Sequence, residues 1–186
     1  MKIYCIIEIA IYNSEAEMNR RYEKQPLKEG KLVLYIDQDC KKIEAIYHIQ
    51  KIIGQGRSCL VYDASYIDNI GLEHKVRIKE CYPDGIDIVR DKNGNLCVEE
   101  RNQNRFSDKK KRFEEAYKLN VKIQESEDLI NSTSKVRQLY YANHTIYFIF
   151  EYNMGINYEE YEEKSLESLI TRIKTLCSII EKYHNQ

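Results

Sequence analysis

Two glycines and a lysine, in that order along the chain, are residue types that can hold a phosphate group. Gly54 and Gly56 separate two runs of β-forming residues, and a glycine backbone can approach phosphate oxygens because it has no Cβ. Lys79 ends the strand-like segment Val76-Arg77-Ile78-Lys79, where an ammonium beside apolar residues can meet the same phosphates. Taken singly, the glycines also fit an ordinary hairpin turn, and the lysine also fits an exposed strand edge.

The residues after the glycines decide between the known phosphate-binding loops. A P-loop needs Gly-Lys-Ser or Gly-Lys-Thr at the start of a helix, and the sequence contains neither. A dinucleotide-binding fold needs the glycines between a strand and a helix. Here the segment 60–66 predicts a second strand, so the glycines join two strands of a sheet.

A glutamate and an abrupt strand end complete the set of candidate residues. Glu115 lies beside the apolar face of a helix that we expect from 107 to 125, with Ser107 near its N-cap. From that position a carboxylate can orient a lysine on the sheet, although a lone helix glutamate is usually solvated. The strand expected at 145–152 ends in polar residues, where free backbone groups can pair with an adenine edge. The apolar helix face comprises Phe113, Ala116, Leu119 and Ile123.

The elements around these residues predict an α+β fold. Asn93-Gly94 between two β-like runs predicts a small extra hairpin, because both residues tolerate positive φ. We expect a twisted antiparallel sheet of about five strands, one helix inserted between the strands, and this hairpin after the third strand. Strands are expected at 3–12, 31–36, 47–53, 60–66, 75–81, 136–141 and 145–152.

The order of these segments resembles the protein kinase family over roughly residues 45–186. The glycine-rich loop, the strand-three lysine motif, the helix-C glutamate and the gatekeeper with its hinge all have counterparts in the family's order. In that order the matching residues are Gly54, Gly56 and Val61; Val76, Ile78 and Lys79; Glu115; and Phe150-Glu151-Tyr152.

The resemblance implies the ATP-binding lobe of a serine/threonine kinase, with phosphoryl transfer to protein hydroxyls in the complete enzyme. Lys79 would hold the phosphates, and Glu115 would orient Lys79 as the second catalytic residue. No metal ligand is expected in this chain, and magnesium is expected only together with the missing lobe. The residues assigned to the nucleotide are Ile53, Gly54, Gln55, Gly56, Ser58, Val61, Lys79, Phe150, Glu151 and Asn153.

A narrower likeness to a bacterial kinase subfamily rests on Ile78-Lys79-Glu80-Cys81-Tyr82-Pro83 and the extra hairpin that follows it. Two residues depart from the family's pattern. Cys59 stands where the third loop glycine usually is, and Arg77 replaces the usual alanine beneath the adenine. A long side chain at Arg77 would crowd the base or fold away from it, so this residue bears directly on nucleotide affinity.

The family's catalytic loop and Asp-Phe-Gly segment have no counterpart in these 186 residues, which end in what resembles the helix before that loop. Without the aspartate base and the metal ligands, phosphoryl transfer loses both the orientation of the acceptor and the neutralisation of developing charge. We therefore expect the chain by itself to be catalytically inactive. The alternative is a non-catalytic kinase-like module that regulates another protein.

The composition disfavours several other classes. With 29 Lys and Arg against 30 Asp and Glu, neither nucleic acid nor a membrane surface is an expected partner. No run of 18 apolar residues occurs, which predicts a soluble protein. The six cysteines form no Cys-x-x-Cys pair and no zinc spacing, which is typical of buried thiols in a reducing cytoplasm. We therefore expect a cytoplasmic protein.

We divide the chain into an N-terminal extension at 1–44 without a readable role, a kinase-like lobe at 45–152, and a hinge with the first helices of a second lobe at 153–186. The last segment predicts a helix, capped by Ser165, whose apolar stripe would be buried in a complete kinase. An uncovered stripe predicts self-association or a partner, namely the missing lobe or a protein substrate. The stripe comprises Leu166, Leu169, Ile170, Ile173, Leu176, Cys177, Ile180 and Tyr183.

Overall fold

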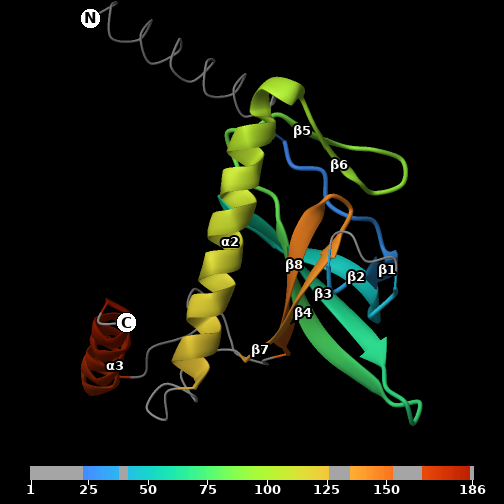
Figure 1. Cartoon of the computed structure of the whole chain (residues 1–186). Helices are drawn as coiled ribbons and strands as arrows, with labels where there is room; N and C mark the ends of the chain where they lie inside the picture. The colour runs from blue at the N-terminus through green and yellow to red at the C-terminus, as the bar shows by residue number, and fades with distance from the viewer. Residues whose placement is uncertain (1–22, 38–41, 126–134, 153–164, 185–186) are drawn as a thin grey trace, which may run out of the picture.

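The computed structural model describes residues 23–37, 42–125, 135–152 and 165–184, and its main element is a curled antiparallel sheet (Figure 1). Within these residues the sheet has six strands, rather than about five, in the order β1-β2-β3-β4-β8-β7. The additional strand is the first, which pairs with the second and comes from the segment assigned to the N-terminal extension. The strand expected at 3–12 lies outside the described residues. The bounds are β1 Gly30–Leu34, β2 Ala45–Gln55, β3 Cys59–Ile67, β4 Glu73–Cys81, β7 Val136–Ala142 and β8 Thr145–Glu151.

The sheet curls until its two edges meet. Tyr35, just after β1, and Tyr141, in β7, exchange backbone hydrogen bonds of 2.9 and 2.8 Å. Because side chains alternate along a strand, every second residue points into an enclosed core and the others point outward. The inward set includes Leu32, Leu34, Tyr47, Ile49, Leu60, Tyr62, Val76, Ile78, Tyr147 and Ile149.

Two short turns show why the chain reverses where it does. Asn143 and His144 have φ values of 50° and 60°, which form a two-residue connection between β7 and β8. The predicted extra hairpin is present, with strands β5 (Ile88–Arg90) and β6 (Leu96–Val98). Its turn places Gly94 at φ 91°, a backbone conformation that favours glycine.

Helix α2 (Gln103–Gln124) packs on the outside of the sheet, following the short 3-10 helix η1 (Glu100–Asn102) (Figure 1). It begins four residues before the expected start, so Ser107 lies inside the helix rather than at its cap. The expected apolar face is confirmed at Phe113 and Ile123, which are buried, and is wrong at Ala116 and Leu119, which are exposed. The inward side is set by large aromatic rings instead: Phe113 stacks on Phe148 with a centroid distance of 4.0 Å.

A buried carboxylate, Glu80, organises the inside of the sheet. Its side chain is fully buried and accepts hydrogen bonds from the hydroxyls of Tyr62 and Tyr147, each at 2.7 Å, and from Arg90 Nη2 at 2.8 Å. Burial, followed by the charge of this carboxylate, raises the pKa of both tyrosine hydroxyls above their ordinary value. Because Arg90 belongs to β5, the same network ties the extra hairpin to the sheet.

The last described helix is α3 (Leu166–His184). Ser165 caps it as expected, since its Oγ accepts a hydrogen bond of 3.2 Å from the Ser168 N–H. Four apolar residues of the predicted stripe are between 45% and 73% exposed, namely Leu166, Ile170, Ile173 and Ile180. Among the helices of the described residues, none has the length and apolar character that crossing a membrane requires.

Candidate functional site

The glycine turn, residues 54–58, connects β2 to β3 and is held against the segment that follows β4. The Gly56 N–H donates to the Cys59 carbonyl at 2.9 Å. The carbonyls of Arg57 and Ser58 accept hydrogen bonds from the N–H groups of Asp84, at 2.7 Å, and Tyr82, at 3.0 Å. The turn is therefore fixed through its backbone, while Gly56 and Ser58 remain exposed.

Nothing in the fold demands glycine at the two motif positions. Neither Gly54 nor Gly56 has a positive φ. A Cβ at Gly54 would lie 3.6 Å from Val61 Cβ, and one at Gly56 would lie 3.9 Å from the Cys59 carbonyl and sulfur, which are ordinary contact distances. The register shift between Ile52 and Gly54 is one physical reason for glycine here, and close approach by a ligand is another.

Lys79 lies beside this turn, on the outer face of β4. It is half-buried, and it pairs in register with Val61 of β3 and Phe148 of β8. Its Nζ atom lies 4.5 Å from the centroid of the Phe150 ring, so an aromatic face holds the ammonium. The structure therefore brings Gly54, Val61 and Lys79 together as the sequence predicts.

A second lysine at the turn was missed by sequence reasoning. The ammonium of Lys24 donates to the Gly56 carbonyl at 2.5 Å and pairs with Asp84 Oδ1 at 2.9 Å, and its side chain is only 1% exposed. Burial raises the pKa of the Cys59 thiol, and the ammonium groups of Lys79 and Lys24 oppose that shift. No sequence signal identifies Lys24, which lies 32 residues before its hydrogen-bond partner in a polar segment.

Glu115 does not occupy the position that sequence reasoning gave it. Its side chain is exposed, and among the ion pairs of the described residues none joins it to Lys79. The neighbouring Glu114 is partly buried and pairs with Lys118 at 2.8 Å. Two residues of α-helix correspond to about 200°, so Glu115 lies almost opposite Phe113, the residue that faces the sheet.

The end of the site expected to hold the base carries charge. Arg77 pairs in register with Asp63 and with Phe150, and its guanidinium lies 5.4 Å from the centroid of the Tyr152 ring. Arg77 Nε and Asp63 Oδ1 are 3.9 Å apart, which is too long for a hydrogen bond. Both atoms are buried without a hydrogen-bond partner among the described residues.

The structure describes only some of the residues that were predicted to bind the base. Phe150 is buried beneath α2, in contact with Phe148. The N–H of Glu151 is already used, because it donates to the Lys135 carbonyl at 2.8 Å. Asn153 and the rest of the expected hinge lie outside the described residues. Ile53, just before the glycine turn, and Gln55, within it, are both exposed.

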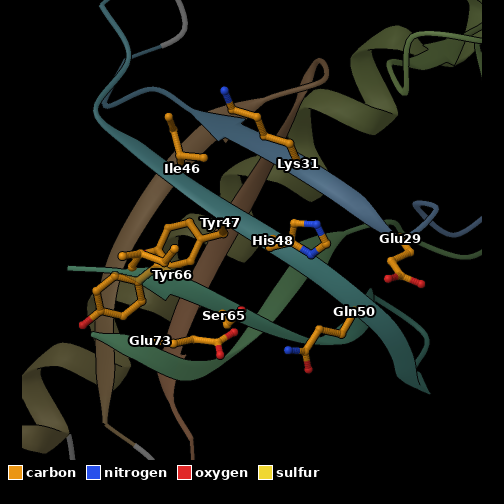
Figure 2. Close-up of a pocket in the computed structure, with 10 residues that line it drawn as sticks. Glu29, Lys31, Ile46, Tyr47, His48, Gln50, Ser65, Tyr66 and Glu73 are labelled. Carbon is orange, nitrogen blue, oxygen red and sulfur yellow. The ribbon is translucent and has the colours of Figure 1, made fainter. Parts of the chain in front are cut away.

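A pocket of about 710 Å³ lies elsewhere, over β1, β2 and β3 (Figure 2). Tyr47 and Tyr66 meet edge to face in it at 5.6 Å, with Lys31, His48 and Glu73 among the polar groups around them. None of its lining residues belongs to the predicted site. The size of a pocket does not by itself indicate what binds there. We place the candidate site at the glycine turn, because the turn and Lys79 offer groups that can bind phosphate.

Comparison with known proteins identifies a fold. No protein-family model matches the chain, and no curated protein matches it. A solved structure described as "PpkA-294 apo form" matches with a TM-score of 0.52 and 22% sequence identity. The match covers 69% of this chain and 39% of that chain, so this chain spans about two fifths of the matched structure. At this identity the likeness shows the fold alone, and it supports a kinase-like fold for this chain.

Proposed function

We propose that this chain is a kinase-like lobe that binds ATP between the glycine turn and Lys79. The observation that carries the proposal is the register of three neighbouring strands. Gly54 pairs with Val61, and Val61 pairs with Lys79, so the three residues lie side by side at the end where β2 turns into β3. A triphosphate at this place would meet backbone N–H groups and an ammonium together.

The remaining roles follow from this placement. The carbonyl of Glu151 and the backbone of Asn153 would hold the adenine edge, with Phe150 behind them. Glu115 would meet Lys79 only after α2 rotates, because its side chain is exposed in the present arrangement. Phosphoryl transfer to a protein hydroxyl, and magnesium with it, would belong to a protein that also supplies an aspartate base and metal ligands.

A non-catalytic kinase-like module is the second candidate. It is favoured by the charged pair Arg77 and Asp63 where a base would lie, and by the absence of an ion pair between Lys79 and Glu115 in the described residues. The two candidates separate on one measurement, because only the first requires ATP to bind. A calorimetric titration of the chain without any detectable binding of ATP would favour the second.

The double variant Gly54→Ala/Gly56→Ala tests the phosphate-binding role directly. Added methyl groups would hold phosphate oxygens away from the backbone, and the loss of one charge-assisted hydrogen bond lowers affinity roughly ten- to a hundredfold. The free energy of unfolding should stay the same or rise by about 0.4–1 kcal/mol, since neither glycine has a positive φ. Calorimetry for ATP and thermal denaturation give the two values.

Gly71→Ala is the matched control for these glycine substitutions. Gly71 has φ 85° in the loop between β3 and β4, so alanine is strained there by about 1 kcal/mol or more. This variant should lose stability and keep its ATP affinity. Equal ATP affinity in the double variant and the wild type would contradict the proposed role of the glycine turn.

Self-association through α3 is a separate proposal. The half-exposed side chains of Ile170, Ile173 and Ile180 would each contribute about 0.8–1.5 kcal/mol if fully buried, half of the value for a fully exposed side chain. We expect the chain to form dimers or larger species, and the charge in Ile173→Glu to shift it toward the monomer. Light scattering over a range of protein concentrations measures this, and a wild-type chain that stays monomeric throughout would contradict it.

A further inference from the structure

Lys24 is an unusual residue because a charged side chain is almost completely enclosed. The ammonium has two partners, the Gly56 carbonyl at 2.5 Å and the Asp84 carboxylate at 2.9 Å, and it lies 5.8 Å from the centroid of the Tyr82 ring. Charged groups are buried in proteins only when they are paired and hydrogen-bonded. The position of Lys24 is therefore specified by the glycine turn and by the segment after β4.

The residues around Lys24 fix its backbone. We call residues 24–27 the N-terminal strap, which runs beside the hairpin of β5 and β6 (Figure 1). Gln25 accepts two hydrogen bonds from Arg90, at its side-chain oxygen at 2.8 Å and at its carbonyl at 2.7 Å. The N–H of Leu27 donates to the hydroxyl of Tyr62 at 3.0 Å. The strap is thus anchored independently of the glycine turn.

Lys24 completes a row of engaged carbonyls in the turn. The carbonyl of Gly56 is held by Lys24, and those of Arg57 and Ser58 are held by backbone N–H groups after β4. In a trans peptide the carbonyl of one residue and the N–H of the next point in opposite directions. The N–H groups of Arg57 and Ser58 therefore point away from these partners, and no described residue accepts a hydrogen bond from either one. Consecutive free N–H groups of this kind attract anions.

We propose that Lys24 is a positioning residue that holds the glycine turn with its N–H groups presented to the phosphates of a nucleotide. The identity of the ligand in this inference rests on the proposed function. The claim that Lys24 holds the glycine turn concerns the protein without ligand. Lys24 does not touch the nucleotide. It acts through Gly56, and the segment regarded as an extension without a role thereby becomes part of the nucleotide site.

Lys24→Met tests this inference, because methionine keeps much of the length and removes the ammonium. Without its partner the Gly56 carbonyl is free to turn, so ATP affinity should fall roughly tenfold. Amide hydrogen exchange should also become faster at Gly56, Tyr82 and Asp84, whose N–H groups hold the turn together. Lys24→Arg keeps a cation in place and should restore much of both values.

Gln25→Ala is the matched control, since it loosens the strap without a contact to the turn. It should lower the melting temperature while leaving ATP affinity and exchange at Gly56 unchanged. Asp84→Asn, at a side chain that is 52% exposed, provides a second test if Lys24→Met does not fold, with a smaller effect in the same direction.

The outcomes separate this inference from the proposed function. Wild-type protein that binds no ATP overturns the proposed function, and exchange at Gly56 still decides whether Lys24 holds the turn. Lys24→Met with wild-type exchange at Gly56 overturns the inference, whether or not ATP binds. Faster exchange together with weaker ATP binding, both absent in Gln25→Ala, supports it.

Discussion

A protein with alanine in place of Glu80 is expected to lose about 3–5 kcal/mol of unfolding free energy, the range found when one partner of a buried ion pair is removed. Alanine would leave the hydroxyls of Tyr62 and Tyr147 without this acceptor, and it would leave the guanidinium of Arg90 with carbonyl acceptors but without its charged partner. The Arg90 side chain is only 7% exposed, so an unpaired charge would stay buried. Domains are stable by only about 5–15 kcal/mol, so the melting temperature should fall steeply.

Urea denaturation followed by circular dichroism measures this loss, with Glu73→Ala as the control. Glu73 lies in the same strand but is exposed, so its removal should change the unfolding free energy by less than about 0.5 kcal/mol. Glu80→Gln keeps one acceptor oxygen, so its loss of unfolding free energy should lie between those of Glu80→Ala and Glu73→Ala. A loss below about 1 kcal/mol for Glu80→Ala would mean that the network does not stabilise the hairpin and the sheet.

The alternation of side chains along β4 shows what the sequence could predict and where it stopped. The strand period places Lys79 and Arg77 on one face and Val76 and Ile78 on the other, and Val76 and Ile78 are indeed buried. The same period sends Glu80 into the core. A carboxylate is stable there only with partners, and one of them, Tyr147, lies 67 residues further along the chain. Local patterns do not contain contacts of that range.

Contacts between residues far apart in the sequence also explain the other differences between the predicted and the observed elements. The segment at 31–36 was predicted as a strand, but its place at the sheet edge depends on pairing with β2 and on the bridge from Tyr35 to Tyr141. On α2, the sequence predicts one inward face, of which Phe113 and Ile123 are buried while Ala116 and Leu119 are exposed. The stacking of Phe113 on Phe148, a residue of the sheet, fixes the rotation of the helix and turns Glu115 outward. The proximity of Lys79 to the glycine turn was predictable, because consecutive strands of the chain pair with each other in the sheet.

Lys79→Met is expected to weaken ATP binding roughly ten- to a hundredfold, which corresponds to the loss of one or more charge-assisted hydrogen bonds to phosphate. The fold should be affected little, because Lys79 is half-buried and its main contact is the Phe150 ring, worth about 0.5–1 kcal/mol. Methionine keeps the aliphatic stem against that ring. Calorimetric titration with ATP, together with a melting curve for each protein, separates affinity from stability.

Lys75→Met is the matched control, because Lys75 lies on the same face of β4 and its ammonium also lies over an aromatic ring, 5.7 Å from the centroid of Tyr152. It stands four residues from Lys79, about 13 Å along the strand, so it cannot reach a phosphate held at the glycine turn. A loss of affinity confined to Lys79→Met would require a specific phosphate contact. Equal losses in both variants would indicate that general positive charge attracts the nucleotide, and unchanged ATP affinity in Lys79→Met would contradict the phosphate contact assigned to Lys79.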